Sequence, residues 1–430
     1  MEKVEKKLWL GKYTWIILLC WLVYTCSYIG KVNYSANINQ VMAHYGVSHA
    51  DAGMVSTFFF FAYGIGQVIN GLFCKKYNIK YMVAGALVIS GTLNLIVAIS
   101  DYFAIVKYLW LCNGLALSVL WPTLIRFLSE TVSRKEMPTA SVTMGTTVAA
   151  GTLIIYGLSA LYARIDFKLS FYTAAVVLPA VAIVWLISCD RIRAQAIAMT
   201  AEEEGETPVV SESQPQSKEE KKASQKLSGD LLVTVLLLAV FAVGVNLISD
   251  GLTTWVPSIL KENYGLDDSL SIILTLALPL LTIFSNLFAV VLNKKIPDFV
   301  SACTFLFACS GGLIALIIGT FSLDLVVVTI ISFALVRALV GGANSTITSI
   351  FPLFMKGKVN SGLIAGVLNG CCYVGSTISS YGLGLIVDNF GWNAVFWLLF
   401  AVCAFVCTAW CVYILCKTVK SKKSKKETDA

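Results

Sequence analysis

The stretch "YTWIILLCWLVYTC" (residues 13–26) is followed directly by "SYIGKVNYSANINQ" (residues 27–40), and the pair sets the class of fold. The first segment carries no charged side chain. The second places Lys31 near the far end of a predicted membrane span over residues 13–34. A lysine in hydrocarbon costs about 2.5–3.5 kcal/mol on insertion scales. A group that compensates this cation inside the membrane is therefore expected.

The whole chain has the composition of an integral membrane protein. Its 430 residues are 57% hydrophobic and 13% charged, and the mean hydropathy is +0.78. Soluble globular chains carry about 25% charged residues, so this chain has too few polar side chains to cover a water-exposed surface. The 13 cysteines and two histidines show no metal-ligand spacing. We therefore predict no metal and no cofactor, and we interpret most cysteines as small apolar fillers.

Long apolar runs predict the number of membrane spans, since a spanning helix needs about 20 apolar residues. Twelve runs qualify: 13–34, 51–72, 80–99, 103–128, 138–160, 169–188, 230–256, 269–292, 299–319, 323–350, 360–385 and 392–416. A polar segment rich in Glu, Ser, Lys and Gln separates the sixth run from the seventh, and it cannot bury enough apolar surface to fold. The predicted units are an N-terminal six-helix bundle (1–189), a flexible cytoplasmic linker (190–229), a C-terminal six-helix bundle (230–416) and a basic cytoplasmic tail (417–430).

The distribution of Lys and Arg predicts the orientation of these spans. With a cytoplasmic N-terminus, 25 of the 32 Lys and Arg residues fall in or at the edge of segments on the inside, and four fall in or near loops on the outside. The other three, Lys31, Arg126 and Arg337, are the cations assigned to the spans themselves. Positive charge concentrates on the cytoplasmic side of membrane proteins. We therefore predict a multi-pass protein of the plasma (inner) membrane with both termini in the cytoplasm.

The second half of the chain repeats features of the first. "SRKEMPTASVTMGTTVAAGTL" follows the fourth span and "KGKVNSGLIAGVLNGCCYVGSTI" follows the tenth, and Gly151 and Gly375 fall at matching places in them. Two related six-helix halves enclose a site near the middle of the bilayer and expose it alternately to each side. The predicted fold class is an all-α membrane protein in which two six-helix bundles surround a central cavity.

Several stretches resemble the major facilitator superfamily and, within it, the organophosphate:phosphate antiporters, which include glycerol-3-phosphate and hexose-phosphate carriers. They are "YIGKVNYSANI", "FFFFAYGIGQVINGLFCKKYNIKY", "LWPTLIRFLSE", "DGLTTWVPSIL", "NSGLIAGVLNGCCYVGS" and "GLIVDNFGWNAVFWL". The resemblance extends over the whole chain. It implies the major facilitator fold and transport of a small molecule by alternating access.

The resemblance also implies a binding site around Lys31, which occupies the position of a helix-1 arginine that binds the substrate phosphate in that family. The family's second arginine falls on Ser249, its helix-5 histidine on Thr147 and its helix-2 lysine on Gln67. A lysine offers a point charge, whereas an arginine grips a phosphate through two parallel bonds. These replacements predict a substrate with less negative charge than a phosphate dianion: a singly charged organic anion, a zwitterion or a polar neutral solute.

Other polar and aromatic residues are predicted to complete this site. Lys31 faces the cavity in the leading interpretation, and snorkelling to the surface or a structural ion pair are the alternatives. The side-chain amides of Gln67, Asn246 and Asn369 are expected to hydrogen-bond the substrate. The tyrosine and tryptophan rings are expected to line the site, and packing against lipid is the alternative for each ring. The predicted substrate-binding set is Tyr28, Lys31, Tyr63, Gln67, Trp121, Thr147, Asn246, Ser249, Asp250, Asn369 and Tyr373.

Four charged residues are candidates for coupling or gating. Asp250 lies in an otherwise uncharged run and has three interpretations: a proton carrier, a salt bridge to Lys31, or an exposed group at a helix break. Arg337 lies near the middle of the tenth span, where it is either functional or in a structural contact. Arg126 and Glu130 are four residues apart, which places them on one helix face as a gating or structural pair.

The leading hypothesis is a secondary active transporter of a small polar organic solute, whether an organic anion, sugar-phosphate-like or zwitterionic. No GxxxxGK[ST] loop is present, so a proton, sodium or counter-substrate gradient is the expected energy source. The alternatives are a multidrug or amphiphile exporter of the same superfamily and a non-transporting ligand sensor on the same scaffold. An enzyme is not expected, because no catalytic cluster falls inside the spans. We expect a monomer in the lipid bilayer that binds no nucleic acid.

Overall fold

The computed structural model describes residues 13–73, 77–133, 136–204, 229–355 and 361–428, and within these ranges it contains helices and no strand. The helices of the N-terminal half are α1 (Thr14–Ser27), η1 (Tyr28–Gly30), α2 (Asn33–Ala36), α3 (Ile38–Tyr45), α4 (His49–Phe73), α5 (Ile79–Ile99), α6 (Phe103–Ser118), α7 (Leu120–Thr131), α8 (Met137–Gly145), α9 (Thr147–Tyr162) and α10 (Leu169–Glu204). Those of the C-terminal half are α12 (Gly229–Tyr264), α13 (Asp268–Thr275), α14 (Ala277–Thr282), α15 (Ser285–Lys295), α16 (Phe299–Thr320), η3 (Phe321–Leu323), α17 (Val326–Ser345), η4 (Thr346–Ile350), α18 (Phe351–Phe354) and α19 (Ser361–Thr428).

Every predicted membrane span has a helical counterpart in the described part of the chain. Ten helical stretches are long and apolar enough to cross a bilayer, and the shorter apolar stretch Thr14–Gly30 matches the first predicted span. The last of the ten, Leu363–Leu415, covers two predicted spans. The backbone between these spans leaves the helical region at Gly391 (φ 75°, ψ 177°), so the stretch consists of two helices joined at a kink. The prediction of an all-α membrane fold is confirmed.

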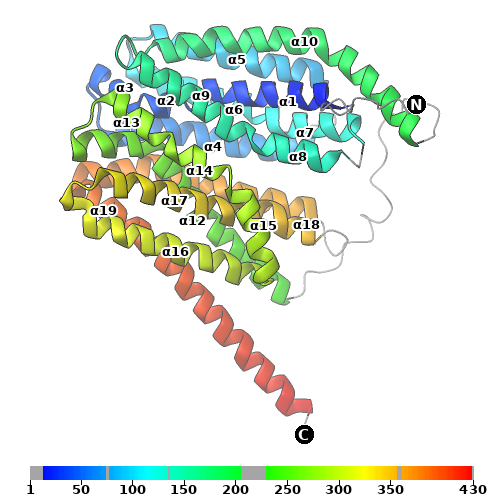
Figure 1. Cartoon of the computed structure of the whole chain (residues 1–430), viewed down its shortest axis with the longest axis vertical. Helices are drawn as coiled ribbons and strands as arrows, with labels where there is room; N and C mark the ends of the chain where they lie inside the picture. Colours follow the sequence, from blue (N-terminus) through cyan, green and yellow to red (C-terminus); the bar gives the residue numbers. More distant parts are fainter. Residues whose placement is uncertain (1–12, 74–76, 134–135, 205–228, 356–360, 429–430) are drawn as a thin grey trace, which may run out of the picture.

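The two halves lie side by side with their helices running in roughly the same direction (Figure 1). Contacts between them come mainly from α4 against α19 and from α9 against α13 and α14. One end of the molecule, which we call the histidine end, carries α3, α13 and the start of α4. The opposite end, which we call the linker end, carries α7, α8, α15 and α18 (Figure 1).

Glycines allow the halves to approach closely near the histidine end. A Cβ atom added to Gly53 of α4 would lie 2.2 Å from the carbonyl oxygen of Ser380 in α19. One added to Gly384 of α19 would lie 2.5 Å from the carbonyl oxygen of His49. No real Cβ approaches so closely, so this packing requires glycine at both positions. Small residues at helix interfaces are the usual means of bringing backbones together in membranes.

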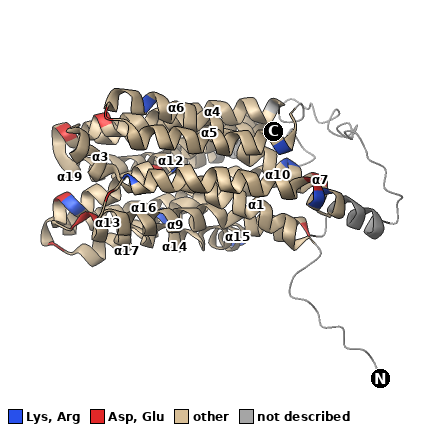
Figure 2. Cartoon of the chain, turned by 90° about the horizontal axis from the view of Figure 1, so that it is seen from above, with Lys and Arg blue, Asp and Glu red and all other residues tan. Residues whose placement is uncertain are grey.

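Charged residues gather towards the two ends of the molecule, and most of the length between the ends is uncharged (Figure 2). This pattern suits a protein whose middle is surrounded by hydrocarbon, because a charge facing lipid is costly. The few charges near the middle therefore need an explanation from the interior of the protein.

The boundary of the linker differs from the prediction, which placed it at residue 190. The helix α10 continues as far as Glu204, since "DRIRAQAIAMTAEEE" is rich in strong helix formers. Two ion pairs hold its first part against the bundle: Lys80 to Asp190 at 2.5 Å and Arg193 to Glu130 at 2.9 Å. The basic tail is likewise helical as far as Thr428.

Candidate functional site

Lys31 lies at a break in the first membrane span. The helix α1 ends at Ser27, a single 3-10 turn follows, and regular helix resumes only at Asn33. The expectation of one continuous helix over residues 13–34 is therefore wrong at this point. The reason lies in the tertiary structure around Gly30.

Buried asparagines stabilise this break. The side-chain amide of Asn113 donates to the carbonyl oxygen of Gly30 at 2.8 Å, and that of Asn94 donates to the same oxygen at 3.3 Å. Asn33 in turn donates to Asn94 at 2.8 Å. Non-helical backbone at membrane depth is tolerated when such groups satisfy it. A side chain at Gly30 would have to displace Leu178, because an added Cβ would lie 2.6 Å from its Cδ1 atom. The position of Lys31 is fixed in this way.

The ammonium group of Lys31 lies among aromatic rings of α4 and of its own segment. Its Nζ atom is 4.2 Å from the ring centroid of Tyr63, 4.9 Å from that of Tyr28 and 5.7 Å from that of Phe59. Each such contact contributes about 0.5–2 kcal/mol. Among the described residues no carboxylate lies within 4.0 Å of Lys31, although it interacts electrostatically with Asp250 of the C-terminal half.

Asp250 and Arg337 bring opposite charges to the same region from the C-terminal half. Asp250 of α12 accepts a hydrogen bond of 2.5 Å from the hydroxyl of Ser376, which accepts one of 3.0 Å from Asn246. The guanidinium of Arg337, on α17, interacts electrostatically with Asp250. Neither charge has an ion-pair partner within 4.0 Å in the described ranges. Two cations and one carboxylate, contributed by both halves, thus form a central charge group with a net charge of +1.

The predicted polar and aromatic residues of α4 and α19 meet beside this group. The amide of Asn369 donates to Gln67 at 3.2 Å, and Gln67 donates to the hydroxyl of Tyr63 at 3.1 Å. The rings of Tyr63 and Tyr373 lie 5.2 Å apart. The contacts of Asn369 with Gln67 and of Tyr373 with Tyr63 cross between the halves, so these residues belong to the same interface as the central charge group.

The remaining predicted residues divide into two kinds. Trp121 is half-buried and packs at 4.8 Å on Tyr24, a neighbour of Tyr28. Thr147 and Ser249 are buried, and the hydroxyl of Thr147 donates to the carbonyl of Met144 in the preceding turn. The structure therefore brings Trp121 to the aromatic group around Lys31. In the described part of the chain, no hydrogen bond or ion pair joins the side chain of Thr147 or Ser249 to the central charge group.

Arg126 and Glu130 lie at the linker end, in the N-terminal half. They form an ion pair of 2.6 Å with the spacing of one helical turn, and Arg193 of α10 joins Glu130 at 2.9 Å. This cluster links α7 to α10 and has no contact with Lys31. Its geometry is that of a structural tie between two helices of one half.

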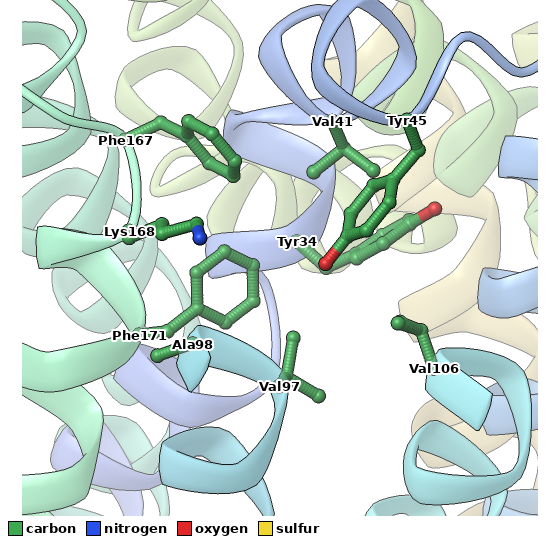
Figure 3. Close-up of a pocket in the computed structure, with 9 residues that line it drawn as sticks. All are labelled: Tyr34, Val41, Tyr45, Val97, Ala98, Val106, Phe167, Lys168 and Phe171. Atoms are coloured by element: carbon green, nitrogen blue, oxygen red, sulfur yellow. The ribbon is translucent and has the colours of Figure 1, made fainter. Parts of the chain in front are cut away.

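A small pocket within the N-terminal half is separate from the central charge group (Figure 3). It has room for roughly one water molecule. Apolar and aromatic side chains form most of its wall, and the amine of Lys168 points between the rings of Phe167 and Phe171. None of the predicted site residues lines it, so it is not the candidate site.

A second group of polar residues joins the halves at the histidine end, and no sequence pattern singles it out. The ring of His49 has Nδ1 at 2.8 Å from Asp388 and Nε2 at 2.8 Å from Glu262. The indole of Trp392 donates to Glu262 at 2.9 Å. The carboxylates are 213 and 339 residues from His49 in the chain. The only available signal was that the chain has just two histidines.

Comparison with known proteins adds family information to this geometry. The family model described as "Major Facilitator Superfamily" matches residues 20–380. Among solved structures, a bacterial homolog to the human lysosomal transporter Spinster, in an inward-facing and occupied conformation, has a TM-score of 0.65 over 92% of this chain and 91% of that chain. The two sequences are 13% identical, so this likeness concerns the fold alone.

Curated relatives match a shorter part of the chain. "Membrane sensor protein UhpC" of Escherichia coli (strain K12) is 23% identical over 121 residues, which is 28% of each protein. "Probable hexose phosphate transport protein" of Chlamydia pneumoniae is 24% identical over 112 residues, which is 26% of this chain and 25% of that protein. The matched region thus spans about a quarter of these relatives.

Proposed function

The chain belongs to the Major Facilitator Superfamily, and on that premise we propose that it is a secondary transporter of a small, singly charged organic anion. The observation that carries this proposal is the central charge group with its net charge of +1. Lys31 and Arg337 supply two positive charges and Asp250 one negative charge. A bound monoanion compensates the excess, whereas a dianion leaves a negative charge unpaired inside the protein, which is costly.

The division of this group between the halves supports alternating access. Lys31 belongs to the N-terminal half, and Asp250 and Arg337 belong to the C-terminal half. A solute that touches all three bridges the two bundles. Rocking of the bundles around a fixed midplane site is the usual mechanism of such transporters. Polar partners for the rest of the solute are available in Gln67 and Asn369.

A series of sugars that differ in charge tests the proposal. Purified protein is reconstituted in proteoliposomes, and these are loaded with labelled gluconate. The rate at which the label leaves is measured with unlabelled glucose, gluconate or glucose 6-phosphate in the outer solution. These carry charges of about 0, −1 and −2 at neutral pH. We expect gluconate to compete best. Stronger competition by glucose 6-phosphate would contradict the proposal and favour the activity named for the hexose phosphate relatives.

A ligand sensor is a second candidate, because one of the matched relatives is named as a membrane sensor protein. A sensor on this scaffold binds its ligand without moving it across the membrane. The two functions are separated by measuring gluconate binding and gluconate counterflow on the same preparation. Binding without counterflow supports the sensor, and binding with counterflow supports the transporter.

We propose that the linker end faces the cytoplasm, because 25 of the 32 Lys and Arg residues lie in segments assigned to that side. The histidine end then faces away from the cytoplasm. An epitope tag placed in the segment 205–228 reports on this orientation. The tag should be protected from protease in intact cells and cleaved after the membrane is opened.

A further inference from the structure

The polar group at the histidine end connects elements of both halves around one imidazole ring. His49 opens α4 in the N-terminal half, while Glu262 and Asp388 belong to α12 and α19 in the C-terminal half. Both ring nitrogens lie 2.8 Å from a carboxylate oxygen. The backbone N–H groups of His49 and Ala50 also donate to Asp388, at 3.1 and 2.8 Å. Asp388 therefore caps the positive N-terminal end of α4 from the opposite half.

The contacts of the ring determine its protonation state. A neutral imidazole has one N–H donor and one acceptor nitrogen, while an ionised carboxylate only accepts hydrogen bonds. Two carboxylates at 2.8 Å on the two nitrogens of His49 can both be satisfied only by the imidazolium form. Loss of the proton leaves one lone pair facing a carboxylate. It also leaves two negative charges without a cation between them.

The neighbouring charges are engaged elsewhere. Asp51, on the same helix as His49, bonds to Ser48 at 3.1 Å. Lys261, next to Glu262, pairs with Asp268 at 2.9 Å. Around the ring, Trp255 and Trp392 lie at 5.7 and 5.6 Å from His49. In the described part of the chain no other cation lies within ion-pair distance of Glu262 or Asp388.

We propose that His49 is a proton-binding site that locks the two halves together at the histidine end. The protonated ring ties the N-terminal half to Glu262 and Asp388, so the histidine end stays closed at low pH. Raising the pH removes the proton, breaks one of the two ties and leaves the carboxylates to repel each other. The fraction of molecules open at the histidine end therefore rises with pH.

Distance measurements across the histidine end test the lock without any substrate, so their outcome is independent of the proposed function. Spin labels are attached through an unnatural ketone amino acid at Ala43 and Asn389, which are exposed and lie in opposite halves. Pulsed electron resonance on the full chain in nanodiscs then gives the distance distribution. We expect the long-distance fraction to rise at least about threefold between about pH 5.5 and about pH 9, across the range in which histidine titrates.

Substitutions decide whether His49 is the group that titrates. In His49→Gln the distance distribution should no longer depend on pH, and Asp388→Asn should weaken the dependence from the other side of the contact. His44→Gln is the matched control, because His44 packs against the rings of Tyr45 and Phe167, away from Glu262 and Asp388. A wild-type distribution that does not change with pH, or a change that persists in His49→Gln, would overturn the proposal. Gel filtration of each variant confirms that it is folded.

Discussion

Charged side chains at the interface between the halves are paired directly at the histidine end but not in the middle. At the histidine end, each ring nitrogen of His49 has a carboxylate at 2.8 Å. In the middle, no carboxylate lies within 4.0 Å of Lys31 or Arg337 in the described ranges, although both interact electrostatically with Asp250. A buried charge is costly unless it is paired and hydrogen-bonded. The proposed lock thus has its charges paired within the protein, whereas the proposed substrate site has a positive charge that a bound anion would compensate.

This difference suggests that the residues that close the histidine end are not the residues that bind the solute. Charges that meet each other directly hold two surfaces together and need no ligand. Charges that surround a site without meeting can be compensated by a solute, which makes the closed arrangement depend on what is bound.

The largest effect is expected for Lys31→Ala, which leaves the central charge group neutral. Removing the charge that would face a bound anion costs about 2–5 kcal/mol. We therefore expect gluconate counterflow to fall between about 30-fold and a few thousand-fold. Lys107→Ala is the control, since Lys107 is also a half-buried lysine beside an aromatic ring but lies near the start of α6. Equal losses in the two variants would remove Lys31 from the site.

Gly53→Val should open the histidine end by overpacking it. The new side chain collides with the backbone of Ser380, and forced methyl groups in a packed core cost about 1–3 kcal/mol. A cost of about 2 kcal/mol changes the ratio of open to closed molecules about thirtyfold, as read from the labels at Ala43 and Asn389. Gly85→Val is the control, because nothing lies within 4 Å of a Cβ at that position. An unchanged distance distribution in Gly53→Val would contradict the close packing described here.

Asp250→Asn should change the preferred substrate charge. The substitution raises the net charge of the central charge group from +1 to +2 and keeps an oxygen for Ser376. We expect the preference for glucose 6-phosphate over gluconate to rise about tenfold, which corresponds to about 1.4 kcal/mol. Competition in the counterflow assay measures it. The control is Asp324→Asn, an exposed carboxylate in a left-handed conformation that asparagine also adopts. No change in preference would remove Asp250 from the site.

Asn113→Ala should loosen the break that positions Lys31. The carbonyl of Gly30 keeps only the longer bond from Asn94, and the buried hydroxyl of Ser90 loses its acceptor, which costs about 1–3 kcal/mol. The melting temperature in detergent should fall, and gluconate binding should weaken with it. Asn389→Ala, an exposed asparagine bonded to its own helix, should leave both unchanged. A fall in melting temperature with unaltered binding would show that the break does not position Lys31.

The smallest effect is expected for Trp392→Phe. It removes one hydrogen bond to Glu262 and keeps the ring packing on His49. A hydrogen bond of this kind contributes about 0.5–1.5 kcal/mol, so the open fraction at low pH should rise about threefold. Trp15→Phe at an exposed position of α1 is the matched control. A pH dependence that disappears altogether would assign the lock to Trp392 rather than to His49.

Much of the fold could be predicted from hydropathy and charge. The lengths of the apolar runs predicted the membrane spans, because a helix needs about 20 apolar residues to cross a bilayer. The sequence also identified Lys31 as a candidate site residue, because a charged side chain within an apolar membrane span is costly. Spacing alone also predicted the pairing of Arg126 with Glu130. Each of these signals is local, so the sequence carries it directly.

The tertiary structure alone decided the rest. The break at Gly30 depends on Asn94 and Asn113, which stand 64 and 83 residues away. The lock depends on carboxylates more than 200 residues from His49. No periodicity or motif in the sequence predicts contacts between residues so far apart in the chain, because these contacts form only when the helices pack together. The sequence by itself thus predicted twelve membrane spans with a costly cation in the first of them, and the packing of the two halves decided which charges meet and which remain apart.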